Sequence, residues 1–325
     1  MFRKMIPTIL AIGLLLSACN FTPLAAPEPT STEPVLPATE TATIPILTLT
    51  DGLDRTVTLS GPPQRIISLT PATTEILFAI GAVDQIVGRD AFSDHPAEAL
   101  ALPDVGGSYG EYSQEAIVAL QPDLVIAGGI NPPELVASLE SLGLTVFFLA
   151  NPTSIDDMYT ALSTLATLTY NEGNDITLIE SLQARVAAVD EKIATISDYP
   201  TVYYELDATD PTLPYTAGRA GPTNFVTPLI ERAGGVNIGS GLESEWASIS
   251  LEQLIVADPY IIILGDSIYG ETPEKVAART GWSVLSAVQS GRIYPFNDSL
   301  VTRPGPRLVD GLEALARLLH PELFE

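Results

Sequence analysis

The chain has 325 residues, of which 15 are Lys or Arg, 40 are Asp or Glu, two are His and one is Cys, so its formal net charge is −25. Proteins bind a phosphate backbone through basic surfaces, so this charge excludes a nucleic-acid-binding protein. A single Cys excludes an internal disulfide and a cysteine-cluster metal site, and two His exclude a three-histidine metal site. Because 46% of the residues are hydrophobic, the chain is able to bury a core.

The N-terminus has the pattern of an export signal. Arg3 and Lys4 precede an apolar run at 6–16, which is too short to span a bilayer as a helix. Leu16-Ser17-Ala18-Cys19 resembles a bacterial lipobox. This resemblance implies that a signal peptide, residues 1–18, is removed and that Cys19 is lipidated. The alternative is an ordinary signal peptide with an incidental Cys.

Residues 19–45 are predicted to be a tether. Positions 20–45 hold six Pro, six Thr and three Glu, with no Gly and no basic residue. Such a composition cannot bury a core, and its prolines favour an extended chain. A lipid at one end and a folded part at the other indicate a protein held at a membrane surface outside the cytoplasm, with the lipid as its only membrane contact.

Folding signals begin at residue 46 and alternate between strands and helices. An alternating pattern around Asp51-Gly52 predicts a hairpin. Thr70-Pro71 has the residue types of a helix start, and Gly81 those of a helix end. Short apolar strands are expected at 65–69, 124–127, 146–149 and 202–204. Alternation of buried strands with helices predicts parallel-sheet α/β units.

One long amphipathic helix is predicted over 175–197. Its apolar residues step by three or four: Ile176, Ile179, Leu182, Val186, Val189, Ile193 and Ile196. The α/β pattern resumes after it. We therefore expect an N-terminal α/β lobe at 46–172, a linking helix at 173–198 and a C-terminal α/β lobe at 199–325.

An internal repeat relates the two halves. Residues 113–128 (SQEAIVALQPDLVIAG) align without a gap to residues 250–265 (SLEQLIVADPYIIILG), at an offset of 137. Each copy reads as a Ser cap, a helix, a turn with Pro and a buried strand. Extending the alignment backwards pairs Tyr109 with Trp246. The alternative is that any two βαβ units share such a pattern.

Several segments, taken in their order and spacing, resemble a known family. They are SLTPATTEILFAIG (68–81), SDHP (93–96), YTAG (215–218), AGGVNIG (233–239) and RPGPR (303–307), together with the repeat. They are similar to class III substrate-binding proteins of ATP-driven importers, most of all to the cobalamin-binding members. The resemblance covers roughly residues 46–325. It implies two doubly wound, three-layer αβα lobes joined by one long helix, with a ligand cleft between the lobes.

Glu115 and Glu252 are the candidate docking residues. Each lies two residues after the Ser that caps a predicted helix, and they occupy matching positions of the repeat. In the resembled family, one Glu on each lobe docks into arginine pockets of a two-fold permease. The alternative is that each is an acidic residue favoured by the positive end of a helix dipole.

Five residues are candidates for the ligand cleft. Tyr109 and Trp246 offer the broad apolar faces that a macrocycle needs, and the alternative for both is core packing. Arg303 matches the ligand-contacting arginine of cobalamin binders, whereas Arg307 is expected to form a structural ion pair. Arg219 and Tyr215 are expected near a loop at the carboxyl edge of a sheet. Whether His95 or Arg307 reaches the cleft stays open.

The sequence thus predicts a receptor and not an enzyme. It has no G-x-S-x-G, P-loop or H-E-x-x-H motif, and neither a metal site nor a cofactor is expected. The expected function is capture of cobalamin or a related corrinoid by a monomer, which delivers it to a permease dimer with cytoplasmic ATPases. A ferric siderophore is the main alternative ligand and haem the third. A surface sensor and an anchored hydrolase are further alternatives.

Overall fold

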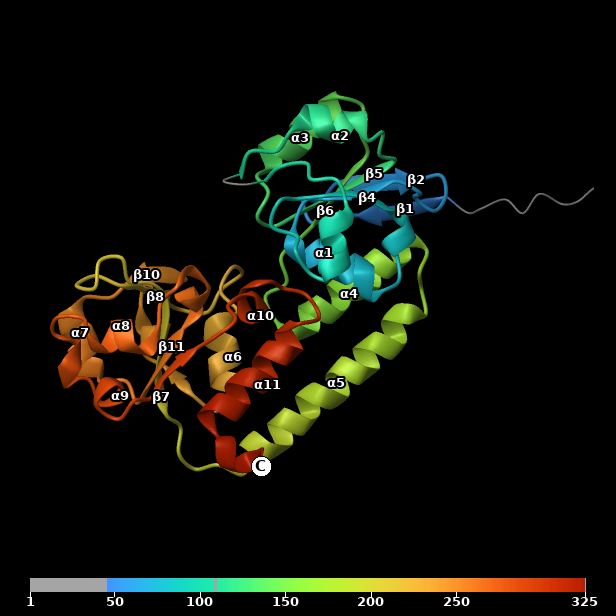
Figure 1. Cartoon of the computed structure of the whole chain (residues 1–325). Coiled ribbons are helices and arrows are strands. Elements are labelled where there is room, and N and C mark those ends of the chain that lie inside the picture. The colour runs from blue at the N-terminus through green and yellow to red at the C-terminus, as the bar shows by residue number, and fades with distance from the viewer. Residues whose placement is uncertain (1–45, 108–109, 325) are drawn as a thin grey trace, which may run out of the picture. The chain divides into compact units, whose positions relative to one another are not determined.

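The computed structural model describes residues 46–107 and 110–324, which Figure 1 draws in colour. The predicted signal peptide (1–18), Cys19, the tether (19–45) and Tyr109 lie outside these residues. Within the described part, no helix is both long enough and apolar enough to cross a membrane.

A hairpin opens the fold, as predicted. Strands β1 (Leu47–Thr50) and β2 (Thr56–Leu59) pair antiparallel around Asp51. The Asp51 carboxylate accepts hydrogen bonds from the backbone N–H groups of Leu53, Arg55 and Phe148. Because Phe148 belongs to β6 (Val146–Leu149), this buried side chain both shapes the turn and fastens the hairpin to the edge of the next sheet.

The N-terminal lobe, which carries β1–β6 and α1–α4, is built on a four-stranded parallel sheet. Its strand order is β4-β3-β5-β6, with β3 at Ile66–Ser68, β4 at Ile86–Arg89 and β5 at Leu124–Gly128. Helix α1 (Pro71–Ala79) follows β3, with the Thr70 hydroxyl accepting from the N–H of Thr73 at 3.2 Å, as expected of a cap.

Neighbouring residues of each strand point to opposite faces of this sheet. Ile66 and Ile126 pack with α1 and α4 (Ile155–Thr169), whereas Ile67 and Val125 pack with α2 (Gln114–Ala119) and α3 (Pro133–Ser141). Helices therefore cover both faces, which gives the three layers that the sequence predicted.

The long helix is α5, Asn174–Ile193. Leu182, Val186, Val189 and Ile193 are buried, as predicted, but the helix ends before 197. Ile176 is 58% exposed, so its inclusion in the apolar face was wrong. It lies six residues before Leu182, about 120° around the helix at about 100° per residue, and thus off the buried stripe.

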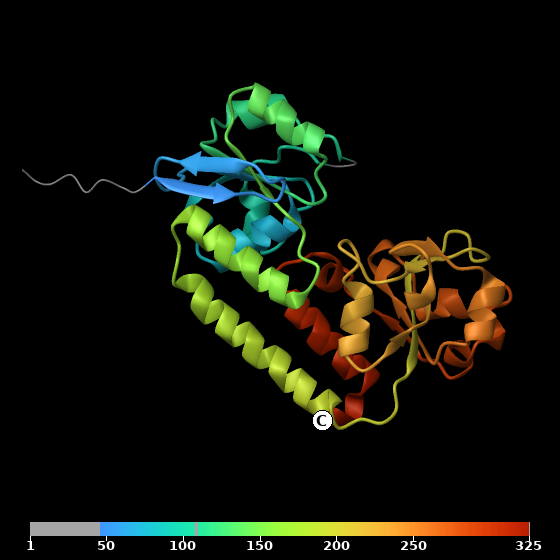
Figure 2. The ribbon, with the colours of Figure 1, turned by 180° about the vertical axis from the view of Figure 1, so that it is seen from behind.

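Helix α11 (Leu308–Leu319) runs alongside α5, as Figures 1 and 2 show from opposite sides. Arg185 of α5 bridges Asp310 and Glu313 of α11, with Nη2 at 2.6 Å and 2.8 Å from their oxygens. Helix α11 therefore packs beside part of the long helix and is tied to it at Arg185. The proposed boundaries at 172/173 and 198/199 stay a prediction.

The C-terminal lobe, which carries β7–β12 and α6–α11, is built on a mixed sheet. Its order is β10-β8-β7-β11-β12, and β9 also pairs with β7. The strands are β7 (Thr201–Asp207), β8 (Tyr215–Ala217), β9 (Val236–Asn237), β10 (Trp246–Ser248), β11 (Ile261–Leu264) and β12 (Ile293–Pro295). The predicted parallel pairing is present between β7 and β11, β11 and β12, and β7 and β9. This lobe adds two antiparallel strands to it, since β8 runs antiparallel to β7 and β10 antiparallel to β8.

Short helices surround this sheet. They are α6 (Val226–Arg232), α7 (Leu251–Ala257), α8 (Pro273–Ala277), α9 (Ser286–Gln289) and α10 (Ser299–Thr302). Single 3₁₀ turns are η1 (Val83–Gln85), η2 (Ala97–Ala101), η4 (Ile238–Gly241), η5 (Gly265–Tyr269), η6 (Trp282–Val284) and η7 (Pro321–Leu323).

The internal repeat is a structural repeat. Ser113 caps α2 and Ser250 caps α7, each by accepting a backbone N–H three residues on. The strand that follows, β5 or β11, lies at the centre of its sheet between two parallel neighbours. The two halves therefore share the order of cap, helix, turn and central strand.

Candidate functional site

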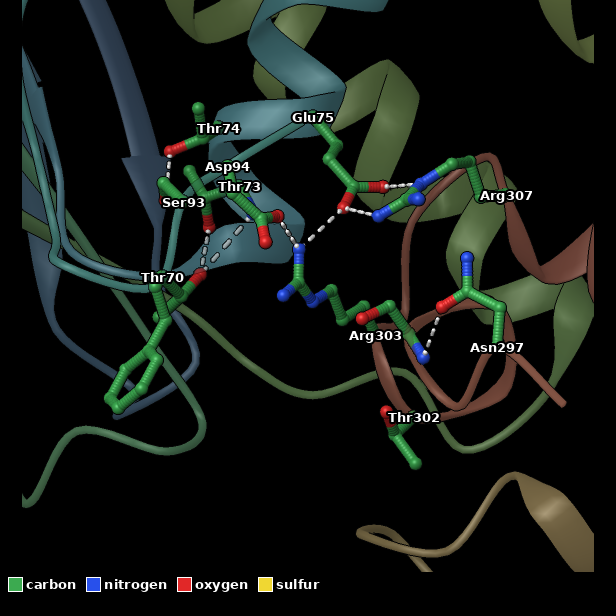
Figure 3. A network of polar contacts seen from close by, with 12 residues as sticks. Thr70, Thr73, Thr74, Glu75, Ser93, Asp94, Asn297, Thr302, Arg303 and Arg307 are labelled. Carbon is green, nitrogen blue, oxygen red and sulfur yellow. Dashed lines mark hydrogen bonds and ion pairs between the residues drawn. The ribbon is translucent and has the colours of Figure 1, made fainter. Parts of the chain in front are cut away.

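Two arginines of the C-terminal lobe reach a buried glutamate of the N-terminal lobe (Figure 3). Glu75, on α1, has a side chain only 2% exposed, and it accepts from Nε of Arg307 at 2.9 Å and from Nη2 of the same guanidinium. Nη1 of Arg303 lies 3.5 Å from Oε1 of Glu75. Arg307 thus forms the structural ion pair that the sequence predicted, and its two-point contact fixes the geometry.

Arg303 has a second partner in Asp94, whose Oδ1 lies 2.5 Å from its Nη1. Figure 3 shows the guanidinium between the carboxylates of Asp94 and Glu75. Burial raises the pKa of Asp94, but the hydrogen bond and charge of Arg303 outweigh burial and hold that pKa below its ordinary value. The pair is therefore ionised at neutral pH, and a ligand oxygen that contacts Arg303 has to compete with Asp94.

Asp298 lies near Arg303 in sequence but faces another way. Its carboxylate accepts from the Tyr204 hydroxyl at 2.8 Å and from the Thr302 hydroxyl at 3.0 Å. Burial raises the pKa of Asp298 despite these bonds. Asp298 therefore serves the packing of its own lobe, while Asp94 supplies the carboxylate next to Arg303.

A small pocket borders this ion-pair network. It has a volume of about 270 Å³ and is lined by Glu75, Phe78, Ala79, His95, Pro96, Pro306 and Arg307. Its walls come from α1, from the segment after β4 and from the start of α11. His95 and Arg307 thus line the same pocket, which lies between the two lobes.

A second group of polar contacts holds Trp246 and Arg219 together. The indole Nε1 of Trp246 donates to the Thr223 hydroxyl at 3.0 Å, and that hydroxyl and the Thr223 N–H donate to Glu245. Nε of Arg219 donates to the Glu243 carbonyl at 2.8 Å. The Thr223 hydrogen bonds lower the pKa of Glu245, with a further contribution from the Arg219 charge. The loops before α6 and before β10 are therefore joined into one unit.

The carboxyl-edge placement of Arg219 was wrong. Arg219 follows β8, which runs antiparallel to β7, so the end of β8 does not lie at the edge where β7, β11 and β12 end. Tyr215 begins β8 and is 40% exposed. In the β8–β10 register Ala217 lies opposite Trp246, so Tyr215, two residues earlier, points to the same face as the indole. A ligand role for Tyr215, Arg219, Trp246 or Arg303 stays a prediction.

The sequence missed the two acidic partners, Glu75 and Asp94. Both lie in segments that carried the family resemblance, but neither is near Arg303 or Arg307 in the sequence. Separations of 232 residues to Arg307 and 209 residues to Arg303 leave no local pattern that pairs them. The sequence shows that both residues are acidic, but it does not show which basic residues they contact.

Glu115 and Glu252 lie in the first turn of α2 and α7, and both are exposed. Neither takes part in an ion pair among the contacts found for the described residues. Over the same part of the chain, no three His, Cys, Asp or Glu side chains are grouped so as to hold a metal ion.

Comparison with known proteins places the fold in a family. The family model described as "Periplasmic binding protein" matches residues 66–300. An uncharacterised ABC transporter substrate-binding lipoprotein of Bacillus subtilis is 28% identical, over 86% of this chain and 87% of its own. A cobalamin-binding protein of Halobacterium salinarum is 28% identical, over 98% and 86%.

A solved structure agrees with these matches. The periplasmic heme-binding protein RhuT of Roseiflexus sp. RS-1 superimposes with a TM-score of 0.69 at 26% identity, covering 80% of this chain and 99% of that one. The region matched by the family model contains the two larger sheets and α5. The chain belongs to the periplasmic binding protein family.

Proposed function

We propose that the protein is the extracytoplasmic substrate-binding lipoprotein of an ABC importer, and that it captures cobalamin or a related corrinoid. The observation that carries this proposal is the repeated cap–helix–strand unit, which presents an exposed Glu at the same place on each lobe. A protein that hands cargo to a two-fold permease needs two such equivalent points. The named relatives support both the class and the ligand.

Ligand capture uses residues of both lobes in this proposal. Trp246 gives an aromatic face, and the Thr223 hydroxyl fixes the orientation of its indole. Tyr215 extends the same face of the β8–β10 pair, and Arg219 lies on the joined loop. Tyr109, the counterpart of Trp246 in the repeat, is proposed as the aromatic of the opposite lobe.

Arg303 is the proposed polar anchor of the ligand. It supplies a charged donor to the amide or phosphate oxygens of a corrinoid. Its contact with Asp94 keeps the guanidinium in place before the ligand arrives. When a ligand oxygen replaces Asp94 as the acceptor, the Arg303 guanidinium is never left as an unpaired buried charge.

A ferric siderophore or haem is the alternative cargo, because the fold is shared with a haem-binding protein. The chain contains two Trp, of which Trp282 is fully buried. Titration of the purified protein with cyanocobalamin, a ferric hydroxamate and haem, read by Trp fluorescence, tests the choice. Saturable quenching by cyanocobalamin alone is expected, and most of it should be lost in Trp246→Phe. Saturable binding of haem or the hydroxamate without cyanocobalamin would replace the proposed ligand.

Docking is proposed to use Glu115 and Glu252 against basic pockets of a permease dimer with cytoplasmic ATPases. The receptor works as a monomer, held by the lipid on Cys19, and has neither a cofactor nor a catalytic step. Glu115→Gln with Glu252→Gln should leave ligand affinity unchanged and reduce transport in reconstituted vesicles. Undiminished transport would refute the docking role.

A further inference from the structure

Each docking glutamate has an exposed aliphatic side chain one helical turn away. Val118 follows Glu115 on α2 and Ile255 follows Glu252 on α7, in both cases by three positions. On a helix, such positions share a face, with Cβ atoms about 5–6 Å apart. Val118 is 43% exposed and Ile255 is 38% exposed. Each helix therefore presents a carboxylate and an aliphatic group side by side to solvent.

The two aliphatic residues are equivalent in the repeat, since 118 and 255 differ by the same offset of 137. The residues just before them, Ile117 and Leu254, are fully buried in both helices. Each helix thus already has its own apolar contact with the core. Val118 and Ile255 are additional apolar groups, about 100° further around the helix and exposed to solvent.

Other large exposed hydrophobic residues of the repeat have no large hydrophobic counterpart. Within 250–265, Val256 and Tyr260 are also exposed, but they correspond to Ala119 and Asp123 in the first copy. Single exposed hydrophobic residues are ordinary on protein surfaces. The combination of Glu and exposed aliphatic residue is the surface feature that both halves share.

Stability of the chain itself does not account for this pair. A β-branched residue at an exposed helix position has lower helix propensity than Ala or Leu and gains little packing there. In a chain of net charge −25, an aliphatic group beside an acidic one fits a partner surface that offers a basic group next to an apolar recess.

We infer that Val118 and Ile255 are part of the permease-docking surface, each entering an apolar recess beside the basic pocket that receives Glu115 or Glu252. This inference rests on the proposed docking role of the two glutamates. The occupant is a two-fold membrane protein with two equivalent sockets, because one chain presents the same pair of groups twice.

The two kinds of group act at different stages of docking. Charge attraction acts at a distance and speeds the encounter, and salt weakens it. Apolar contact forms only when the surfaces meet, so it slows dissociation. The glutamates therefore set the association rate, and the aliphatic residues set the lifetime of the complex.

The test is to measure binding of the purified protein to its cognate permease–ATPase complex in lipid nanodiscs by surface plasmon resonance. Because about two-fifths of each side chain remains to be buried, Val118→Ser and Ile255→Ser should each raise the dissociation rate about fivefold, and together about 25-fold. The association rate and its dependence on salt should stay unchanged.

Two exposed apolar residues outside the matched pair serve as controls. Ile176→Ser, on α5, and Leu142→Ser, at the end of α3, change side chains that are 58% and 49% exposed and that lie on neither docking helix. Both should dissociate as the parent does. If Val118→Ser with Ile255→Ser also dissociates as the parent does, or if the controls dissociate equally fast, the inference is wrong.

The glutamate variant separates this inference from the proposed function. Glu115→Gln with Glu252→Gln should lower the association rate and its salt dependence. If that variant binds as the parent does, the docking role itself fails. If it binds weakly while the aliphatic variants bind normally, the inference about Val118 and Ile255 fails alone. Equal urea midpoints for all variants exclude unfolding as the cause.

Discussion

A buried carboxyl group in the C-terminal lobe should make stability fall as pH rises. Asp266 follows β11 and is 5% exposed, and its Oδ1 has no hydrogen-bond partner. Burial, then the negative charges of Glu205 and Glu271, raise the pKa of Asp266 to about 7, against the lowering effect of Arg279. Arg279 is engaged by Glu205 at 2.6 Å and 2.7 Å and by Glu271 at 3.0 Å. The Arg279 guanidinium therefore offsets the negative charge of three acidic residues, and it forms ion pairs with two of them.

The direction of this pH dependence follows from the number of protons that the folded and unfolded states bind. The unfolded chain releases the Asp266 proton near pH 4, whereas the folded protein keeps it to about pH 7. The folded state therefore binds more protons across this window, and the free energy of unfolding decreases as pH rises through it. A shift of about three units corresponds to about 4 kcal/mol for the acid cluster as a whole.

Asp266→Asn removes the titrating group and keeps its size. Urea unfolding at pH 4 to 8 should show that the variant gains stability relative to the parent as pH rises, by about 4 kcal/mol over the range. Asp258→Asn is the control. Asp258 is exposed, and hydrogen bonds from Ser286 lower its pKa, so this variant should keep the decline seen in the parent. An Asp266→Asn variant with the parent's decline would refute the reasoning.

Three further experiments test the packing. Glu75→Ala should lower the free energy of unfolding by about 3 kcal/mol, because it leaves a buried guanidinium charge unpaired. A double-mutant cycle with Arg307→Ala, measured by urea unfolding, should show that the two residues are coupled. A coupling energy under about 0.5 kcal/mol would contradict this. Leu182→Ala should lower the free energy of unfolding by about 3 kcal/mol, because Leu182 is buried, whereas Ile176→Ala should lower it by under about 0.5 kcal/mol. Equal urea midpoints for the two variants would show that the buried face of α5 is misassigned. Gly218→Ala should lower the melting temperature, because a Cβ there would lie 2.1 Å from the backbone carbonyl oxygen of Ser244. An unchanged melting temperature would show that the loop at Ser244 moves to make room for the methyl group.

Local signals predicted much of the fold. The Thr70 cap and the Gly81 end of α1 follow from single residue types, and the structure has both. The repeat found at 113–128 and 250–265 is likewise a repeat of cap, helix and strand. These features depend on neighbouring residues, which is why a sequence reveals them.

Features that depend on distant segments were not predicted. The direction of β8 depends on its pairing with β7 and β10. The three residues of β8 do not indicate whether the strand runs parallel or antiparallel to its neighbours. The partners of Arg303 and Arg307 lie more than 200 residues earlier. The Ile176 error has a different cause, because a step of three residues twice in succession turns a side chain away from the stripe.

The position of α11 has a consequence for how the chain matures. A chain emerges from a ribosome or a translocation channel with its N-terminus first, so 308–319 appear after every strand of both lobes. Until then α5 packs on α4 but lacks α11, and Arg185 lacks both of its acidic partners. The two lobes are able to form their sheets earlier, but the packing of the connector between them is completed only when α11 appears. A chain cut before Leu308 would carry every strand and the contact of α4 with the linking helix, but it would leave the face of that helix that packs on α11 uncovered.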